Sequence, residues 1–352
     1  MNDSLDWLTI ALLPGVGPRA ARELAARGPL REVLRRPKQH ADLLPREALS
    51  SLETGRARSA AEAELRRTEA LAVGLVAVDA PDYPALLRQI YDAPTLLWVR
   101  GGPGGRIAGE GPIVAIVGTR GATLQGRSLA RGMARDLAAA GATIVSGLAR
   151  GIDAAAHEGA LDGRGRTVAV LGSGVDRVYP PEHVALAARI AEDGAVVSEL
   201  PLGTAPLAFN FPRRNRIIAG LCGAVVVVEA PERSGALVTA RLALDEGREV
   251  FAVPGHPAAP GSAGTNALIR DGALLVRDAR DVAEGIGACL GPALESEPAD
   301  EILRALERDV PRSVDDIQER SGRPTGELLA RLTALELADR VRRLPGALFV
   351  KS

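Results

Sequence analysis

The sequence has 352 residues, of which 46% are hydrophobic and 25% charged, so the chain can bury a sizeable core and does not have the composition of a disordered protein. Its formal net charge of −1 excludes a basic field over the whole surface, so any nucleic-acid site must be a local cluster of charge. Lysine occurs only at Lys38 and Lys351, which excludes the Gly-Lys-Ser/Thr step of a P-loop, and the two cysteines and four histidines have no metal-ligand spacing.

The chain begins Met-Asn-Asp-Ser-Leu-Asp, without the basic start of a signal peptide, and no apolar run approaches the length of a membrane span. We therefore expect a cytoplasmic protein with no membrane segment, no metal and no cofactor. Residues 1–70 are rich in Ala, Arg and Leu at helical spacing, and they predict a small helical domain of helix-hairpin-helix or SAM-like type.

Within this domain, the segment Leu13-Pro-Gly-Val-Gly-Pro18 lies between two helical patterns. A dinucleotide-binding glycine turn must follow a strand, whereas residues 5–12 favour a helix. The segment is therefore interpreted as a helix-hairpin-helix element, whose glycine turn can offer backbone N–H groups to a phosphate. A purely structural helical hairpin is the open alternative.

Residues 71–290 are expected to form the central domain. Its lead-in contains residues 79–100, which we expect to pack on the domain, and residues 101–111, whose six glycines predict an irregular connection. Short β-branched runs then alternate with helical segments long enough for right-handed crossovers. The runs are residues 113–117, 143–145, 167–171, 195–197, 224–228 and 249–253, with 274–276 as a weaker seventh. They are apolar throughout, as in strands buried on both faces, so the sequence predicts an α/β fold with a doubly wound, mostly parallel, extended Rossmann-like sheet.

Residues 298–352 predict a third domain. Helical patterns at 301–308, 314–320 and 325–337 precede a hairpin-like segment at 341–350, which is the outline of a winged helix. The segment in the position of a recognition helix, residues 324–337, carries Glu327 and Glu336 against Arg331. We therefore expect it to contact protein, or to regulate, rather than to enter a DNA groove.

Three strand-to-helix turns of the central domain have features of phosphate sites. They are Gly118-Thr119-Arg120, the segment from Ser146-Gly147 to Asp153, and Ser234-Gly235 followed by Thr239. Ligands of open α/β sheets lie outside the carboxyl ends of the strands, where helix N-termini carry unsatisfied N–H groups. We expect Asp153 to cap the following helix, and His157 to have a structural role because no partner nucleophile is evident.

The segment Phe209-Asn-Phe-Pro-Arg-Arg-Asn-Arg216 is the most informative in the chain. It holds two of the four phenylalanines and three arginines immediately before a predicted helix. Arginines at a helix N-terminus oppose its dipole unless an anion joins them. Aromatic rings beside arginines are also the two components of a single-strand nucleic-acid site, because bases stack on the rings and the charges follow the phosphates. Core phenylalanines with solvated arginines are the alternative.

These motifs together resemble the DprA/Smf family (DNA processing protein A). The resemblance runs in order through segments that cover about half of the chain: Val114–Arg120, Ser146–His157, Val170–Asp176 with Tyr179-Pro180, Ser198-Glu199, Phe211–Leu221, Val228-Glu229, Ser234–Arg241, Arg248–Gly255 and Asn266–Ile269. One departure concerns residues 207–209, where some relatives place a basic residue and this chain has Leu207-Ala-Phe209.

The resemblance implies a protein that binds single-stranded DNA, protects incoming DNA and loads RecA recombinase onto it during natural transformation. It also implies a homodimer formed through the Rossmann-like domain, and no catalytic residues. Carried onto matching positions, the DNA contacts are Gly118, Thr119, Arg120, Ser146, Gly147, Asn210, Phe211, Pro212, Arg213, Asn215, Arg216, Ser234, Gly235 and Thr239.

Two other functions stay open. The first is a nucleotide-processing hydrolase of the phosphoribohydrolase type on a related sheet, but the corresponding turn, residues 233–239, lacks the glutamate that such enzymes use. The second is a regulator that binds duplex DNA through the helix-hairpin-helix element and the winged helix.

Overall fold

The computed structural model describes residues 2–101, 107, 109–287, 301–306, 310–337 and 340–351. The chain divides into two compact units, residues 1–294 and 295–352, which are described separately below. The subdivision of the first unit at residue 70, which the sequence predicts, stays a prediction.

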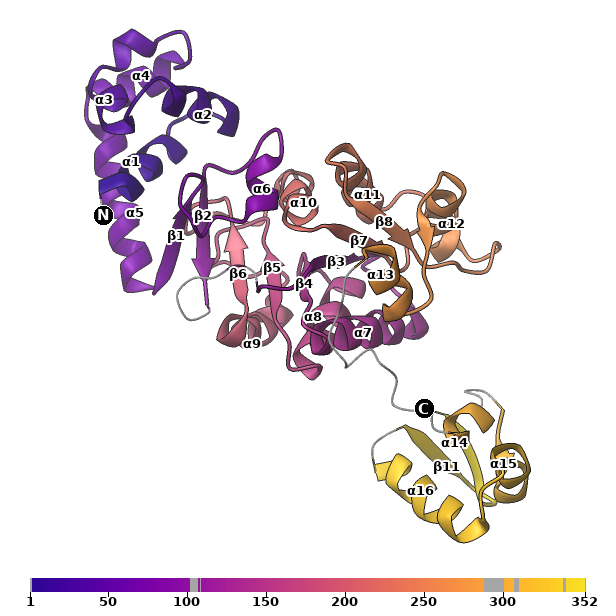
Figure 1. Cartoon of the computed structure of the whole chain (residues 1–352). Coiled ribbons are helices and arrows are strands. Elements are labelled where there is room, and N and C mark those ends of the chain that lie inside the picture. Colours follow the sequence, from indigo (N-terminus) through magenta and orange to yellow (C-terminus); the bar gives the residue numbers. More distant parts are fainter. Residues whose placement is uncertain are drawn as a thin grey trace. The chain divides into compact units, whose positions relative to one another are not determined.

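A nine-stranded sheet forms the centre of the first unit (Figure 1). Its strands are β1 (Val73–Ala77), β2 (Leu96–Arg100), β3 (Ile113–Val117), β4 (Thr143–Ser146), β5 (Thr167–Val170), β6 (Ala195–Ser198), β7 (Ala224–Val227), β8 (Glu249–Ala252) and β9 (Leu274–Leu275). They lie in the order β1-β2-β6-β5-β4-β3-β7-β8-β9. The seven strands from β3 onward pair in parallel and correspond to the seven predicted runs.

The strand order reverses direction between β3 and β7. From β3 the chain adds β4, β5 and β6 on one side, and it then returns to place β7, β8 and β9 on the other. The chain therefore leaves the carboxyl ends of β3 and β7 in opposite directions, which opens a crevice between them. This topological switch point is where a doubly wound sheet is expected to bind its ligand.

Helices cover both faces of the sheet (Figure 1). The helices of the central part are α6 (Ala85–Gln89), α7 (Leu124–Ala139), α8 (Ile152–Asp162), α9 (Val184–Asp193), α10 (Asn210–Leu221), α11 (Gly235–Asp245), α12 (Ala263–Arg270) and α13 (Ala279–Gly285). Successive residues of β3 point to opposite faces, so Val114 and Ile116 pack in one hydrophobic cluster while Ala115 and Val117 pack in the other. This double burial explains why the parallel strands are continuous apolar runs.

Two antiparallel strands at the edge of the sheet are not predicted as strands from the sequence. β1 pairs with β2, and β2 pairs antiparallel with β6. Residues 79–100 thus pack on the central domain, as expected, but they do so partly by extending its sheet. The buried Glu64 accepts hydrogen bonds from Trp98 Nε1 of β2 (3.1 Å) and from the backbone N–H of Leu202 (2.7 Å), which ties the N-terminal helices to the sheet.

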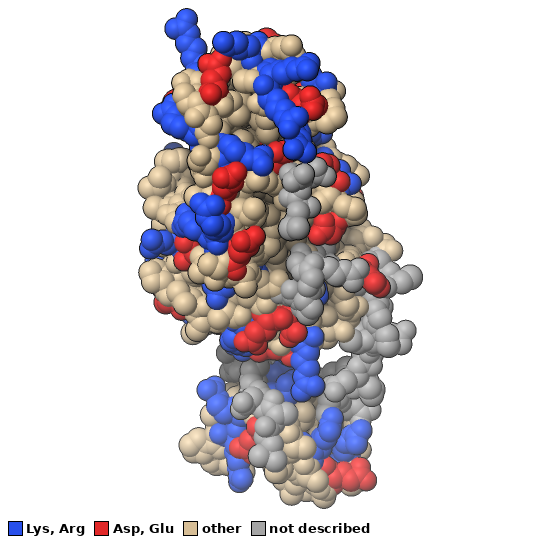
Figure 2. Space-filling view, turned by 90° about the vertical axis from the view of Figure 1, so that its left-hand side faces the viewer, with Lys and Arg blue, Asp and Glu red and all other residues tan. Residues whose placement is uncertain are grey.

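The N-terminal helices are α1 (Asn2–Ala11), α2 (Pro18–Ala26), α3 (Leu30–Arg35), α4 (Arg46–Glu53) and α5 (Arg56–Ala70). The predicted hairpin lies between α1 and α2, where Gly15 has a φ of +72° that favours glycine. Pro18 starts α2, a position at which the missing N–H costs no hydrogen bond. Figure 2 shows basic and acidic side chains interspersed over these helices, in agreement with the near-zero net charge.

The second unit has the outline of a winged helix. Its helices are α14 (Glu301–Ala305), α15 (Val314–Ser321) and α16 (Thr325–Leu337), and its strands are β10 (Arg312–Ser313), β11 (Val341–Leu344) and β12 (Leu348–Lys351). The short β10, which the sequence does not predict, pairs with β12 beside the predicted hairpin. In neither unit is any described helix both long and apolar enough to cross a membrane.

Candidate functional site

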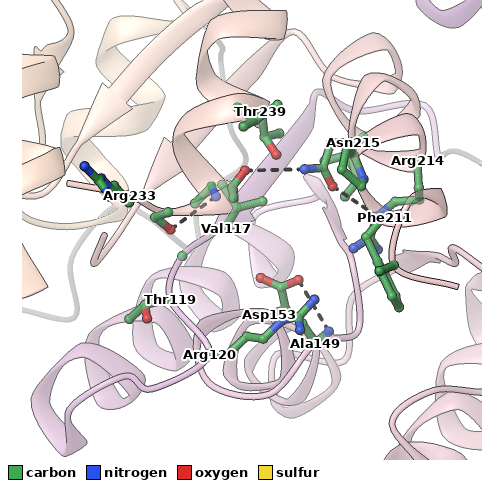
Figure 3. A pocket seen from close by; sticks show the side chains of 18 of the residues that line it. Val117, Thr119, Arg120, Ala149, Asp153, Phe211, Arg214, Asn215, Arg233 and Thr239 are labelled. Atoms are coloured by element: carbon green, nitrogen blue, oxygen red, sulfur yellow. Dashed lines mark hydrogen bonds between the residues drawn. The ribbon is translucent and has the colours of Figure 1, made fainter. Parts of the chain in front are cut away.

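An open pocket of about 640 Å³ lies at the switch point, and we call it the switch pocket (Figure 3). Its walls come from the turn after β3, the turn after β7 and the first turns of α10 and α11. The lining residues are Val117, Gly118, Thr119, Arg120, Ala149, Asp153, Tyr179, Pro206, Ala208, Phe211, Pro212, Arg214, Asn215, Ile218, Pro231, Arg233, Ser234, Gly235, Ala236, Val238 and Thr239.

Segments more than a hundred residues apart in the sequence meet in this pocket. Of the fourteen residues predicted to contact DNA, those that line it are Gly118, Thr119, Arg120, Phe211, Pro212, Asn215, Ser234, Gly235 and Thr239. The parallel topology explains this convergence, because the carboxyl ends of β3 and β7 lie at the same edge of the sheet.

The aromatic surface of the pocket is formed by Phe211 and Tyr179. Their ring centres are 5.8 Å apart with an interplanar angle of 46°, and the Arg120 guanidinium carbon lies 5.3 Å from the centre of the Phe211 ring. Tyr179 belongs to the motifs that carry the family resemblance but was not predicted as a site residue, because it follows β5 in a loop whose path the sequence does not determine. Ring faces and a guanidinium together form a surface on which a planar base can stack.

Arg214 also lines the pocket, although it was not predicted as a site residue. Its buried guanidinium donates to the carbonyl of Gly147 (Nη1 to O, 2.7 Å) and to that of Val170, so it joins the turn after β4 to the end of β5. Burial lowers the pKa of Arg214 to about 10. Helical spacing from Phe211 would have identified it, since positions i+3, i+4 and i+7 are Arg214, Asn215 and Ile218, and all three line the pocket.

The turn after β4 has a structural role that the sequence did not predict. A Cβ on Gly147 would lie 2.2 Å from Nη1 of Arg214, so glycine is needed here to admit a side chain of the protein rather than a ligand. The hydroxyl of Ser146 is fully buried and donates to the carbonyl of Ile116 (2.7 Å). Asp153 lies in the first turn of α8 and accepts from the backbone N–H groups of Gly147 (3.2 Å) and Ala149 (3.4 Å) instead of capping the helix from the preceding position.

Three predicted contacts of the α10 segment lie outside the switch pocket. Arg216 is buried and pairs with Glu199 and with Asp92 (Nε to Oδ2, 3.0 Å). Burial raises the pKa of Glu199, and the charge of Arg216 opposes this rise. Asn210 is buried, with its Nδ2 3.5 Å from the carbonyl of Ala205, whereas Arg213 is exposed to solvent.

Two helix N-termini near the pocket differ in their capacity to bind an anion. The N-terminus of α7 is occupied by the protein itself, because the Glu229 carboxylate accepts from the backbone N–H of Thr123 (3.0 Å). The N-terminus of α11 forms part of the pocket wall at Gly235, after Ser234, whose hydroxyl accepts from the N–H of Ala236 (3.3 Å). Of the two, α11 therefore offers N–H groups and dipole to a phosphate in the pocket.

The charge of the switch pocket is positive. Its charged lining residues, all in the described part of the chain, are Arg120, Arg214, Arg233 and Asp153. Arg120 and Arg233 are exposed and form no ion pair or hydrogen bond with the described residues, so both can bind an external anion. The described residues contain no group of three His, Cys, Asp or Glu side chains arranged to hold a metal.

His157 is not part of this site. It is fully buried, and its Nδ1 lies 2.7 Å from Oγ1 of Thr167, whose hydroxyl donates to the carbonyl of Ile144. Burial lowers the pKa of His157 to about 3, so the ring is neutral at physiological pH. These contacts agree with the structural role predicted for His157, which stays a prediction.

Sequence comparison identifies two family regions in the chain. The family described as DNA recombination-mediator protein A matches residues 74–287, and the DprA winged helix domain matches residues 291–347. Protein Smf from Escherichia coli is 42% identical over 287 residues, which span 77% of this chain and 76% of that protein. DNA processing protein DprA from Streptococcus pneumoniae is 46% identical over 204 residues, spanning 57% of this chain and 70% of that one.

Solved structures agree with this assignment. DprA from Streptococcus pneumoniae superposes with a TM-score of 0.69 at 36% identity, covering 81% of this chain and 97% of the other. DNA processing protein A from Helicobacter pylori, for which a single-stranded-DNA-binding mode is described, superposes with a TM-score of 0.54 at 29% identity, covering 61% and 95%. The predicted resemblance and the predicted Rossmann-like and winged-helix folds are confirmed. This chain belongs to the DprA/Smf family of DNA recombination-mediator proteins.

Proposed function

We propose that the chain binds single-stranded DNA in the switch pocket and that the pocket is a binding site rather than a catalytic one. The observation that carries the proposal is the presence of an aromatic platform, Phe211 with Tyr179, beside the exposed Arg120 in one open pocket. Stacking and charge neutralisation are the two terms that dominate single-strand binding. The single-strand binding described for the Helicobacter pylori relative supports the same ligand.

An aromatic platform on which bases stack favours single strands over duplex. Bases of a duplex are stacked on one another, and exposing one costs a few kcal/mol, whereas a single strand presents its base faces freely. Arginine and the α11 N-terminus contact phosphates, which carry no sequence information. The site therefore favours binding without sequence preference.

A hydrolase is less well supported by the same pocket. Among its described lining residues Asp153 is the only carboxylate, and its oxygen already accepts two backbone N–H groups of the turn before α8. Burial raises the pKa of Asp153, while the nearby Arg214 opposes the rise. These contacts favour a carboxylate that stabilises the pocket wall over one that acts on a substrate.

We further propose that the chain protects incoming DNA, loads RecA onto the bound strand during transformation, and acts as a homodimer through the Rossmann-like unit. The family membership supports these roles. For the dimer, the short strand β9 lies at the edge of the sheet and exposes Leu274 and Leu275, and unpaired apolar strand edges are natural pairing sites. Sedimentation of Leu275→Lys should give a monomer at concentrations where the parent chain is a dimer.

The single-strand proposal is tested by fluorescence anisotropy with a labelled oligothymidine and the matching duplex across a salt series. Arg120→Ala should reduce the slope of log K against log[salt] by about 0.7, the value for one lost phosphate contact, and Phe211→Ala should weaken binding with an unchanged slope. The exposed Arg189 of α9 provides the control, and Arg189→Ala should change neither quantity. Equal affinity for duplex and single strand at moderate salt would refute the proposal.

A further inference from the structure

The first turn of α10 has a second exposed face. Phe209 precedes the helix with helical backbone angles (φ −72°, ψ −16°), so Phe209, Pro212 and Arg213 follow the i, i+3, i+4 spacing of one helix face. All three are exposed, and Phe209 is 62% exposed. Pro212 also lines the switch pocket and so lies at the border between the two surfaces, and we call Phe209 and Arg213 the α10 outer face.

Phe209 is the most exposed of the chain's phenylalanines and tryptophans, and among the aromatic residues only Tyr91 (71%) is more exposed. Phe251, Phe349 and both tryptophans are buried. One exposed apolar side chain is common on proteins and proves nothing alone. Phe209, however, lies between residues of the switch-pocket wall, since Pro206, Ala208 and Pro212 all line it.

Arg213 adds an available charge to the same face. It forms no hydrogen bond or ion pair with the described residues, and its charge acts on Glu199, whose carboxylate is already paired with Arg216. Fixed cations at a helix N-terminus oppose the helix dipole, which is relieved when an anion binds. An exposed ring and an unpaired arginine one turn apart repeat the combination of Phe211 and Arg120 inside the pocket.

The two rings lie on different sides of the helix end. Residues i and i+2 of a helix differ by about 200° in direction, so Phe211 faces the pocket while Phe209 faces outward. A strand that leaves the pocket over the start of α10 crosses about one helix diameter, roughly 10–12 Å, to reach Phe209. That path is within reach of a few nucleotides of extended strand.

We propose that the α10 outer face is a second stacking site for the same DNA strand. A base that has left the switch pocket stacks on Phe209, and Arg213 binds the adjacent phosphate. This inference rests on the proposed binding of single-stranded DNA and extends the contact surface beyond the switch pocket. A protein partner docking on Phe209 is the competing occupant.

The test measures affinity against oligonucleotide length, from about 4 to about 16 nucleotides, the range of single-strand site sizes. Phe209→Ala should leave the shortest oligothymidines bound as in the parent chain and weaken binding of the longest about 5- to 150-fold, the loss that corresponds to one stacked base. Arg213→Gln should lower the salt slope by about 0.7 on the long oligonucleotides only. Leu244→Ala, which truncates an exposed apolar residue at the far end of α11, is the control without effect.

A direct readout comes from Phe209→Trp. Trp7 and Trp98 are buried, so the new indole is the exposed one, and its fluorescence should be quenched by long but not by the shortest oligothymidines. If Phe211→Ala weakens every length while Phe209→Ala weakens none and the indole is not quenched, the second site is refuted and the switch pocket stands. If Phe211→Ala is also without effect, the proposed function itself fails.

Discussion

Arg216 provides a sharp test of which arginines hold the structure together and which are available to DNA. Its side chain and that of Glu199 are each 10% exposed and form a buried ion pair. Replacing Arg216 by methionine removes the charge and leaves the Glu199 carboxyl buried without its partner. Breaking such a pair costs about 3–5 kcal/mol.

The protonation of Glu199 limits this cost. A glutamic acid with an ordinary pKa near 4.3 can be neutralised at pH 7 for about 3.7 kcal/mol, so the part of the loss that comes from the unpaired Glu199 carboxylate should not exceed that value. At pH 5.5 the same limit falls to about 1.6 kcal/mol, because protonation becomes easier by about 1.4 kcal/mol per pH unit. We therefore expect Arg216→Met to lower the free energy of unfolding by about 2–4 kcal/mol at pH 7 and by less at pH 5.5.

Urea unfolding followed by circular dichroism at both pH values measures this effect, and anisotropy over a salt series measures DNA binding. The salt slope of Arg216→Met should equal that of the parent chain, whereas Arg120→Met should lower it by about 0.7. A variant at position 216 that is as stable as the parent chain and has a lower slope would show that Arg216 contacts phosphate. The assignment of Arg216 to the fold would then be wrong.

Three further predictions concern the rest of the first unit. The pKa of His157 is lowered to about 3 in the folded chain, so between pH 6.5 and 3 only the unfolded chain binds a proton at this residue. The free energy of unfolding should therefore fall by about 1.4 kcal/mol per pH unit as the pH is lowered through that window. Urea unfolding at pH 7.5 and pH 5 measures this fall, and His157→Asn should lose the part of it that comes from His157. Gly147→Ala should displace Arg214, lower the free energy of unfolding by about 1–3 kcal/mol and weaken DNA binding. The control is Gly223→Ala, where a Cβ meets no atom within 4 Å, and this variant should unfold at the same urea concentration as the parent chain. A chain that ends at Gly287 should bind oligothymidine as the full chain does, and loss of binding would instead support the duplex-regulator hypothesis.

Strands β3 to β8 were predictable because almost all of their residues are buried and most of them are apolar, so each strand is visible in the sequence as a continuous apolar run. β1 and β2 were not predicted because their local sequence gives weak strand signals. β1 is only five residues long and contains the exposed Gly74, and β2 is buried but follows Pro94 in a stretch dense in turn residues. Whether an edge strand of this kind forms depends more on the strand with which it pairs than on its own composition.

The convergence of the site was predictable from topology, but the roles of individual arginines were not. Arg213, Arg214 and Arg216 are close in sequence, yet a helix turns about 100° per residue and sends them to solvent, to the pocket wall and to Glu199. The acidic partners come from residues 92 and 199, which no local pattern connects to α10. The sequence therefore identifies the charged segment, while packing decides which charges remain available.

The central claim, that single-stranded DNA lies against Phe211 in the switch pocket, is tested most directly by photocrosslinking. An oligothymidine carrying one 5-iodouracil is irradiated on the full chain, and the adducts are mapped by mass spectrometry. The account predicts adducts on Phe211 or Tyr179, and on Phe209 when the labelled base lies a few nucleotides away. Adducts confined to the α1–α2 hairpin or to the winged-helix unit, with none on these rings, would contradict it.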